Sequence, residues 1–478
     1  MKRVRRFIRK LFRVIAIILL TFLLGLIIII LVSRKDYGNL ESGIGQENKT
    51  LALTQVNIIS MDQGREILEK HKTLLIDNGL ITGILPDSVS IPSGYSVKSL
   101  DGKYVMPGLI DMHTHIFDRS DLAMYLGYGV TTVRNMMGFP MHLRWREQVN
   151  NSTYPGATLI TASPTINSGA NTGPFHKNIK TPQEGMEAVN AYKKKGYDFI
   201  KIYDGLDQQQ FESIMQEADH LDMDVAGHPP HAIDLDVLLQ YPITSFEHIE
   251  EVIQGMMDYK LDTVMGREIA KKLKQNGAKV TATLSPFHHI YKTTVEGEPF
   301  MNSIPKVPIN PFIEFIGKKQ LSQWIDSNEG TYKWHVDKYR CMQDLVRILN
   351  EEGVTLLLGT DTGPNLTAPG LTLHEEIALL HENSLSPYAI IKSGTIDAAN
   401  TLGMQNEIGS VTKGKKSQLL ILDDDPLTNL DTMRKPYAII NNTQWYDEGK
   451  IDGLRKLGSN KSGILMTLGR FLDHILSK

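Results

Sequence analysis

The hydrophobic and polar positions of the chain fall into four successive patterns. A continuous apolar run covers residues 14–32, and short apolar runs separated by turn residues cover residues 51–105. In residues 106–404 short apolar segments alternate with helix-length segments, and residues 405–445 return to short strands. Strands that alternate with helices indicate a parallel βα architecture, whereas short strands joined by turn signals indicate hairpins.

The central region contains eight candidate strands, the number that a (β/α)8 barrel needs. They are residues 109–115, 130–135, 158–163, 198–203, 223–228, 244–248, 279–284 and 354–361. We predict an α/β fold in which residues 106–404 form a TIM-like barrel. Because both flanks are rich in short strands, we expect residues 51–105 and 405–445 to form one small β-sandwich domain. The stretch 288–352 is longer than one connecting helix requires, and we expect a lid or a subunit contact there, which leaves a homo-oligomer open.

The apolar run from Val14 to Val32 predicts a membrane-spanning helix. As a helix it would be about 28 Å long, close to the ~30 Å hydrocarbon core of a bilayer. Seven of the 13 preceding residues are basic and none is acidic. By the positive-inside bias the stub 1–13 stays in the cytoplasm and the body is exported, to an extracellular or periplasmic location. A cleaved signal peptide is the alternative, but the run is longer than a usual signal core and no small-residue cleavage site follows.

Residues 33–50 are expected to be a tether, and residues 446–478 a C-terminal extension that ends in an amphipathic helix. We expect that helix to dock on the body or on a partner subunit. A helix on the membrane surface is the less favoured alternative, because its polar face is not strongly basic. Its apolar stripe consists of Ile464, Leu465, Leu468, Phe471, Leu472, Ile475 and Leu476.

Composition excludes several classes of protein. The chain has 478 residues, 41% of them hydrophobic, so intrinsic disorder is excluded as its main description. Apart from the N-terminal stub, acidic residues outnumber basic ones, so no nucleic-acid partner is expected. The single cysteine, Cys341, excludes an internal disulfide and a cysteine-based zinc site.

The strongest chemical signal is a pair of histidines, His113 and His115, at the end of the first candidate barrel strand. Residues i and i+2 of a strand point to the same face, so the two imidazoles and Asp111 project together. Two imidazoles side by side form a preformed metal chelate.

Four more candidate ligands end other strands: Lys201, His228, His248 and Asp361. A buried lysine ammonium is costly unless it is paired or chemically changed, and CO₂ addition to the amine would turn it into an anionic carbamate ligand. The carboxyl ends of parallel barrel strands surround one mouth. We therefore expect all six side chains to meet around a metal site there.

The chain resembles the amidohydrolase superfamily, close to the imidazolonepropionase-like and Xaa-Pro-dipeptidase-like metal-dependent hydrolases. The resemblance covers about residues 50–435. It rests on VMPGLIDMHTH, GVTTVRN, FIKIYDG, FEHIEE, GTDTG and the segment LHEEIALLHENSLSPYAIIKSGTIDAANTLGM. It also includes IGSVTKGKKSQLLILDDDP, in which Gln418 stands where an aspartate is more usual.

The resemblance implies a binuclear centre. In it His113 and His115 would bind the more buried metal, His228 and His248 the more exposed one, and the carbamate of Lys201 would bridge the two. Asp361 would bind the buried metal and serve as the catalytic acid and base. Zinc is the first expectation for such ligands, and manganese, iron or cobalt fit them as well.

The implied activity is hydrolysis of a C–N bond, in a dipeptide-like or a cyclic amide. Ester, lactone or phosphotriester hydrolysis is the alternative within enzymes, and a non-catalytic surface scaffold is the alternative outside them. Candidate substrate contacts on the loops at the same mouth are Asn171, His176, Tyr203, His231 and His288.

Overall fold

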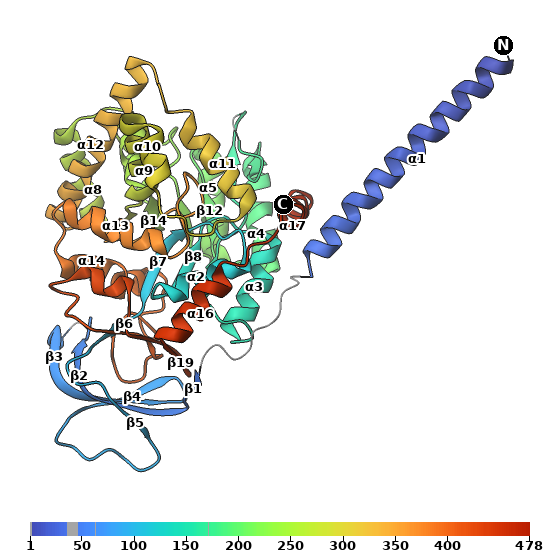
Figure 1. Ribbon diagram of the computed structural model, residues 1–478. Coiled ribbons are helices and arrows are strands. Elements are labelled where there is room, and N and C mark those ends of the chain that lie inside the picture. The colour runs from blue at the N-terminus through green and yellow to red at the C-terminus, as the bar shows by residue number, and fades with distance from the viewer. Residues whose placement is uncertain (1, 36–45, 63, 171) are drawn as a thin grey trace.

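The N-terminal segment is a long helix that projects away from the body (Figure 1). The computed structural model describes residues 2–35, 46–62, 64–170 and 172–478, so most of the expected tether and Asn171 lie outside the described residues. Helix α1 (Lys2–Ser33) runs without a break through the basic stub and the apolar run. Within the described ranges it alone is long and apolar enough to cross a membrane, over Arg5–Ser33, and a signal sequence would have the same properties.

The strands of both flanks form one mixed sheet of nine strands. Strand β17 pairs antiparallel with β6, so the strands that follow the central region are hydrogen-bonded directly to those that precede it. The sheet has a buried apolar core of its own that includes Leu51, Leu74 and Leu419. Its strands are β1 (Gln46–Glu47), β2 (Thr50–Ile59), β3 (Leu68–Asp77), β4 (Leu80–Pro86), β5 (Ser96–Ser99), β6 (Tyr104–Pro107), β17 (Gln418–Leu422), β18 (Ala438–Asn441) and β19 (Gln444–Asp447).

The central region contains two parallel sheets, and each of the eight expected segments holds an observed strand. The three-stranded sheet consists of β7 (Leu109–Thr114), β8 (Val130–Asn135) and β9 (Thr158–Thr161). The seven-stranded sheet runs in the order β11 (Lys177–Ile179), β10 (Ile166–Ser168), β12 (Ile200–Ile202), β13 (Val225–Gly227), β14 (Ile243–Glu247), β15 (Lys279–Thr281) and β16 (Thr355–Leu357). Parallel bridges connect the two sheets, between Ala162 and Phe199 and between Thr114 and Thr362.

Helices follow the parallel strands and cover them. Helix α4 (Pro182–Lys195) begins after an N-cap threonine, since the Thr181 side chain accepts a hydrogen bond of 3.2 Å from the Glu184 amide. The other helices of this part are α2 (Arg119–Gly127), α3 (Pro140–Asn150), α5 (Gln208–His220), α6 (Leu235–Leu238), α7 (Ile249–Glu251) with a following π-turn (Val252–Met256), α8 (Thr263–Gln275), α13 (Leu371–Glu382), α14 (Pro387–Ser393) and α15 (Ile396–Thr401); a 3₁₀ turn (Leu430–Arg434) precedes β18.

The long stretch between β15 and β16 is helical. Its helices are α9 (Leu284–Glu296), α10 (Glu298–Ser303), α11 (Pro311–Ser322) and α12 (Glu329–Glu351). Side chains of α11 line the cavity described below.

The C-terminal extension forms α16 (Glu448–Gly458) and α17 (Ile464–Ser477). Two buried ion pairs hold it on the body, Arg470 with Asp118 at 2.9 Å and Lys461 with Asp121 at 2.6 Å. We call these four residues the C-terminal clasp. The helix docks on the body, as expected, but Phe471 is the one residue of the apolar stripe that is buried there. The buried residues of α17 are Thr467, Gly469, Arg470, Phe471, Asp473 and His474, because the body offers charged partners to this face.

Candidate metal centre

Strand β7 brings its two histidines to the carboxylate of Asp361. The Nε2 atoms of His113 and His115 lie 3.4 and 2.9 Å from Asp361 Oδ1. Ligand atoms of the three side chains all lie within 4.8 Å of one another, a group that can hold a metal ion. His113 is fully buried and His115 is partly exposed toward the cavity.

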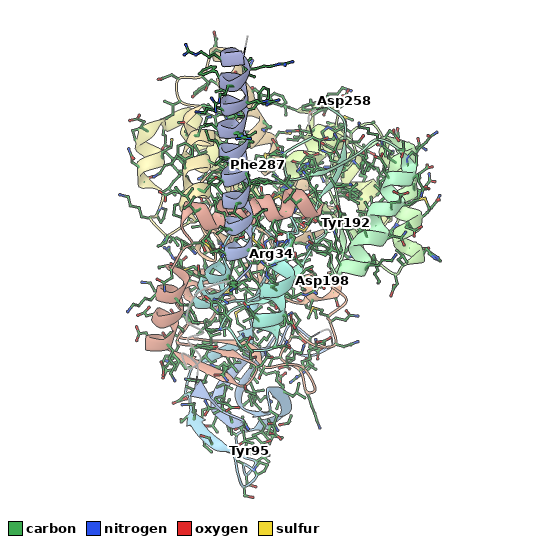
Figure 2. All side chains as sticks on the ribbon, turned by 90° about the vertical axis from the view of Figure 1, so that its right-hand side faces the viewer. Arg34, Tyr95, Tyr192, Asp198, Asp258 and Phe287 are labelled. Carbon is green, nitrogen blue, oxygen red and sulfur yellow. The ribbon has the colours of Figure 1, made fainter. Side chains whose placement is uncertain are left out.

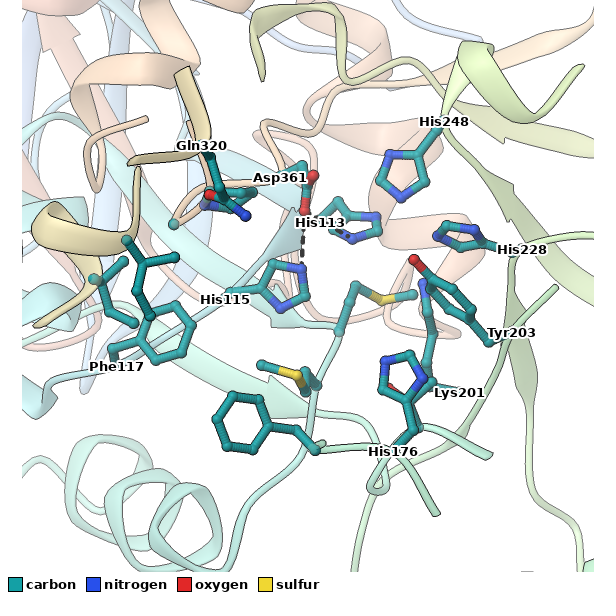
Figure 3. Close-up of a pocket in the computed structure, with 18 of the residues that line it drawn as sticks. His113, His115, Phe117, His176, Lys201, Tyr203, His228, His248, Gln320 and Asp361 are labelled. Atoms are coloured by element: carbon teal, nitrogen blue, oxygen red, sulfur yellow. Dashed lines mark ion pairs between the residues drawn. The ribbon is translucent and has the colours of Figure 1, made fainter. Parts of the chain in front are cut away.

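The remaining three candidates face the same cavity from neighbouring strands (Figure 3). Lys201 is the middle residue of β12, while His228 and His248 directly follow β13 and β14. The His248 ring centroid lies 4.4 Å from that of His113 and 4.7 Å from that of His228. All six side chains therefore line one cavity of about 380 Å³.

Two of the six adopt a backbone conformation that side chains rarely tolerate. The φ angles are 70° at His248 and 49° at Asp361, both in the left-handed region. Strain of this kind persists where the surrounding structure enforces it, and it is concentrated at functional sites. A contact of 2.7 Å from His248 Nδ1 to the Thr283 hydroxyl fixes the ring.

Lys201 is the unusual group of the cavity. Its side chain is buried, and among the described residues its Nζ has no hydrogen-bond partner. Burial lowers its pKa to about 8, against the opposing attraction of Glu247 and Asp361. The amine is therefore easily neutral, which is the form that adds CO₂, and a divalent ion beside the resulting carbamate would satisfy the orphaned group.

The charge states of the other side chains suit cation binding. Burial, and then the charge of Lys201, lowers the pKa of His113 well below its usual value, and burial does the same to His248. Neutral imidazoles are the form that binds metals. Burial acts to raise the pKa of Asp361, but the hydrogen bond from His115 and nearby cationic groups bring it below its usual value. The residues thus fit a divalent metal centre.

A buried glutamate that the sequence analysis missed orients the first ligand. Glu247 Oε2 lies 2.8 Å from His113 Nδ1, and its other oxygen accepts a 2.7 Å bond from Arg134 Nη2. A carboxylate only accepts, so Nδ1 carries the proton and Nε2 is left for a metal. Burial acts to raise the pKa of Glu247, but Arg134 and Lys201 lower it. In the sequence, the position of Glu247 directly before His248 was the one sign of a role at the site. Its partners, His113 and Arg134, are revealed only by the fold.

Asp111 takes no part in the cavity, although its side chain was expected to project beside the histidines. Its carboxylate accepts a 2.7 Å hydrogen bond from the Thr360 hydroxyl and a 3.1 Å bond from the Thr360 amide. Burial raises its pKa to about 8. Asp111 therefore supports the loop that carries Asp361.

Two of the expected substrate contacts line the cavity. The Tyr203 ring stacks on His228 with centroids 3.9 Å apart, and the His176 ring lies 4.7 Å from Tyr203. Burial lowers the pKa of His176 to about 4, so this ring is neutral at pH 7.

The other two described candidates are not part of the cavity wall. His231 pairs with Glu251 at 2.7 Å, and His288 Nδ1 lies 3.0 Å from the Tyr339 hydroxyl. Both rings serve contacts within the protein.

The rest of the described wall is mainly apolar and was missed by the sequence analysis, because it comes from loops and from helices α7, α9 and α11. Its polar members are Thr165, Glu250 and Gln320. Its apolar side chains are Phe117, Met136, Met137, Phe175, Phe287, Ile313, Ile316 and Pro364.

Comparison with known proteins decides the family. The model of the amidohydrolase family matches residues 104–447, which include every strand that carries a candidate ligand. The chain belongs to the amidohydrolase family. Its resemblance to this group, expected from the motifs, is thereby confirmed, and the protein is a hydrolase of C–N bonds in a metal-dependent family.

Individual relatives of this amidohydrolase are distant. An imidazolonepropionase of Fusobacterium nucleatum is 22% identical over 412 residues, which cover 79% of this chain and 88% of that protein. The solved bottromycin amidohydrolase superposes with a TM-score of 0.71 at 21% identity, covering 90% of this chain and 96% of that one. A Xaa-Pro dipeptidase with bound methionine gives 0.65 at 18% identity, covering 83% and 100%. At these identities the solved structures show a shared fold.

Proposed function

We propose that the protein hydrolyses the C–N bond of a neutral, largely apolar amide or cyclic amide with a binuclear divalent-metal centre. One observation carries the proposal: six ligand-type side chains from five strands and the segments that follow them share one cavity, and the buried Lys201 amine among them has no hydrogen-bond partner in the described chain. The strand pairings and bridges also support a closed (β/α)8 barrel at 106–404 as the scaffold, with 51–105 and 405–445 as its β-domain.

In this proposal His113, His115 and Asp361 would hold the buried ion, His228 and His248 would hold the exposed ion, and carboxylated Lys201 would be a ligand to both. Zinc is the first choice for this ligand set, followed by manganese, iron and cobalt. When bound, such ions polarise a substrate carbonyl and acidify a shared water.

The protein's own groups move the protons. Asp361 is ionised and faces the cavity, so it accepts a proton from the attacking water and returns it to the leaving nitrogen. Burial raises the pKa of Tyr203, so its phenol stays protonated and donates a hydrogen bond toward the developing oxyanion.

The cavity wall supports a substrate without a carboxylate. The described lining contains no arginine, its one lysine is Lys201, and His176 is neutral. Glu250, which also lines the cavity, is itself acidic and pairs with Lys338, so it offers no positive charge to a substrate. A dipeptide carboxylate would lose its hydration here without gaining a cationic side chain as its partner.

A matched pair of substrates tests this: an N-acylpyrrolidine and the corresponding N-acylproline differ only in the carboxylate. We expect kcat/KM to favour the pyrrolidine amide by about tenfold or more, equivalent to ~1.4 kcal/mol. A preference for the proline compound would contradict the substrate class. Preferential cleavage of a matched lactone would favour the alternative chemistry.

We further propose that α1 is an uncleaved anchor, with its basic end in the cytoplasm and the body exported. Its apolar length and the basic residues at its start support this. The protein should then remain with membranes after a wash at high salt and at alkaline pH. Release of the protein by the wash would contradict anchoring.

A further inference from the structure

Helix α17 turns its apolar side outward. Leu465 is 66% exposed and Leu476 is 76% exposed, and Ile464, Leu468 and Ile475 on the same side are exposed as well. A helix that docks on a protein core ordinarily shows the reverse arrangement. The outward stripe is therefore an apolar surface that the body of the protein does not cover.

Polar contacts hold the opposite side on the body. Besides the C-terminal clasp, Asp473 accepts a 3.0 Å bond from Arg34 Nε, and His474 Nε2 donates a 2.7 Å bond to the Phe175 carbonyl. Burial lowers the pKa of His474 to about 4, so this ring is neutral and its proton serves the bond. These contacts fix which side of α17 faces outward.

The position of α17 relative to α1 is the second observation. Gly469 packs so closely on α1 that an added Cβ would lie 2.7 Å from the Ile29 carbonyl and 2.8 Å from Ser33 Cβ. In Figure 1 α17 is seen nearly end-on while α1 extends across the view, and Figure 2 shows Arg34 where the two meet the body. Helix α17 therefore runs across the axis of α1.

The contact with Ile29 fixes where α17 lies along the apolar run of α1. Ile29 is three residues before Val32, the end of the apolar run, so α17 lies about 5 Å inside that end. Interfacial helices bury their apolar side about 5–10 Å into the boundary between headgroups and acyl chains. A bilayer crossed by α1 would thus meet the outward stripe at the depth that suits it.

Three lysines lie around the C-terminal end of α17, two of them from other elements. Lys195 lies at the end of α4 and bonds the Ser477 carbonyl, while Lys478 donates a 2.9 Å bond to the His176 carbonyl. Lys177 is close enough that, after burial, its charge lowers the pKa of both other lysines. The fold thereby supplies the basic charge that the helix itself lacks and that anionic lipid headgroups attract.

We propose that α17 is an interfacial helix whose outward stripe inserts into the membrane leaflet on the side of the body, beside the exit of α1. The proposal rests on the proposed anchoring by α1. It also places the cavity next to the lipid, because α17 holds the Phe175–His176 segment of the wall and Phe471 packs 4.7 Å from the Phe175 ring. Substrates that partition into the bilayer would then enter from it.

The test measures lipid contact at three sites of the full-length protein. Leu465→Cys probes the stripe, Leu20→Cys probes the proposed span, and Val97→Cys is the matched control, an exposed apolar residue on β5. Cys341 is buried, so the unsubstituted protein is the labelling blank. Each variant carries an environment-sensitive fluorophore and is reconstituted into phosphatidylcholine–phosphatidylglycerol vesicles with and without doxyl-labelled acyl chains.

We expect doxyl lipids to quench positions 465 and 20 to a comparable extent and to leave position 97 unchanged. Quenching at 20 but not at 465 overturns the interfacial helix and leaves the anchor intact. If position 465 is then quenched by aqueous acrylamide, the stripe faces solvent; if neither quencher reaches it, a protein partner or second copy covers it. No lipid quenching at position 20 overturns the anchor and the inference that rests on it.

Discussion

Two buried polar clusters, the C-terminal clasp and the candidate metal centre, take side chains from the same stretch of chain, residues 113–121. They differ in how their charges are compensated. In the C-terminal clasp each carboxylate, Asp118 and Asp121, has its own cation at 2.9 Å or less. In the metal centre the Lys201 amine has no hydrogen-bond partner among the described side chains and backbone groups. A buried ion pair is complete in itself, whereas a buried lone amine needs something that the chain does not supply. The first cluster is structural and the second calls for a ligand.

The largest effect is expected when the lysine of the candidate metal centre is replaced by alanine. Lys201→Ala should lower kcat/KM by about a thousandfold or more, since proton transfer and carbonyl polarisation both depend on the centre. Metal per folded protein should fall with it. Lys461→Ala, a buried lysine of the clasp, is the control and should keep its metal. Steady-state kinetics measure kcat/KM and elemental analysis measures the metal content of both variants. Normal activity in Lys201→Ala would refute the proposed centre.

Breaking the clasp should act on stability instead. Asp118→Ala leaves Arg470 without its buried carboxylate, and the free energy of unfolding should fall by about 3–5 kcal/mol. The pair of Arg455 with the exposed carboxylate of Asp452 offers a control, for which Asp452→Ala should cost less than about 1 kcal/mol. Denaturant titration measures both. Equal losses in the two variants would show that the clasp is not a special stabilising contact.

A smaller effect is expected where a buried carboxylate supports a ligand. Glu247→Gln removes the anionic acceptor of His113 Nδ1, and metal affinity should fall by about 10–100-fold. Glu376→Gln is the matched control, because this buried glutamate instead accepts bonds from Leu284 and Ser285. Competition with a chelator measures the affinity, and an unchanged value in Glu247→Gln would remove the orienting role.

The last prediction concerns acid, and its effect is small just below pH 6.5 and grows toward pH 4. His474 has a folded pKa of about 4, lowered chiefly by burial, so below about pH 6.5 the unfolded chain takes up a proton that the folded chain does not. Its contribution to stability is present above pH 6.5 and is lost as the pH falls toward 4, at up to about 1.4 kcal/mol per pH unit. His474→Gln should show a shallower fall over this window in thermal unfolding. The same slope in both proteins would contradict the assignment.

Much of the centre was predictable because its signals are local. His113 and His115 alternate along one strand, and Lys201, His228, His248 and Asp361 each stand at or near the end of an apolar strand segment. Parallel strands bring such positions to one mouth whatever the loops do. His231 and His288 had a similar local signal but lie outside the cavity, because loop direction depends on packing.

The outward stripe of α17 shows the opposite case. Periodicity grouped its apolar residues into one stripe, from which only Phe471 is buried on the body, but it does not say which side the body covers. That was decided by partners more than 100 residues away in the chain: Asp118 for Arg470, Arg34 for Asp473 and the Phe175 carbonyl for His474.

The order of residues along the chain was thus enough to indicate the family, to predict the candidate ligands and to reveal a helix long enough to span a bilayer, because each depends on neighbouring residues and on strand or helix repeat. Only the folded arrangement assigned Glu247 to His113, left Lys201 without a partner and turned α17 outward. These features come from charges and cavities formed by segments far apart in the chain, and their energies depend on burial that no local pattern encodes.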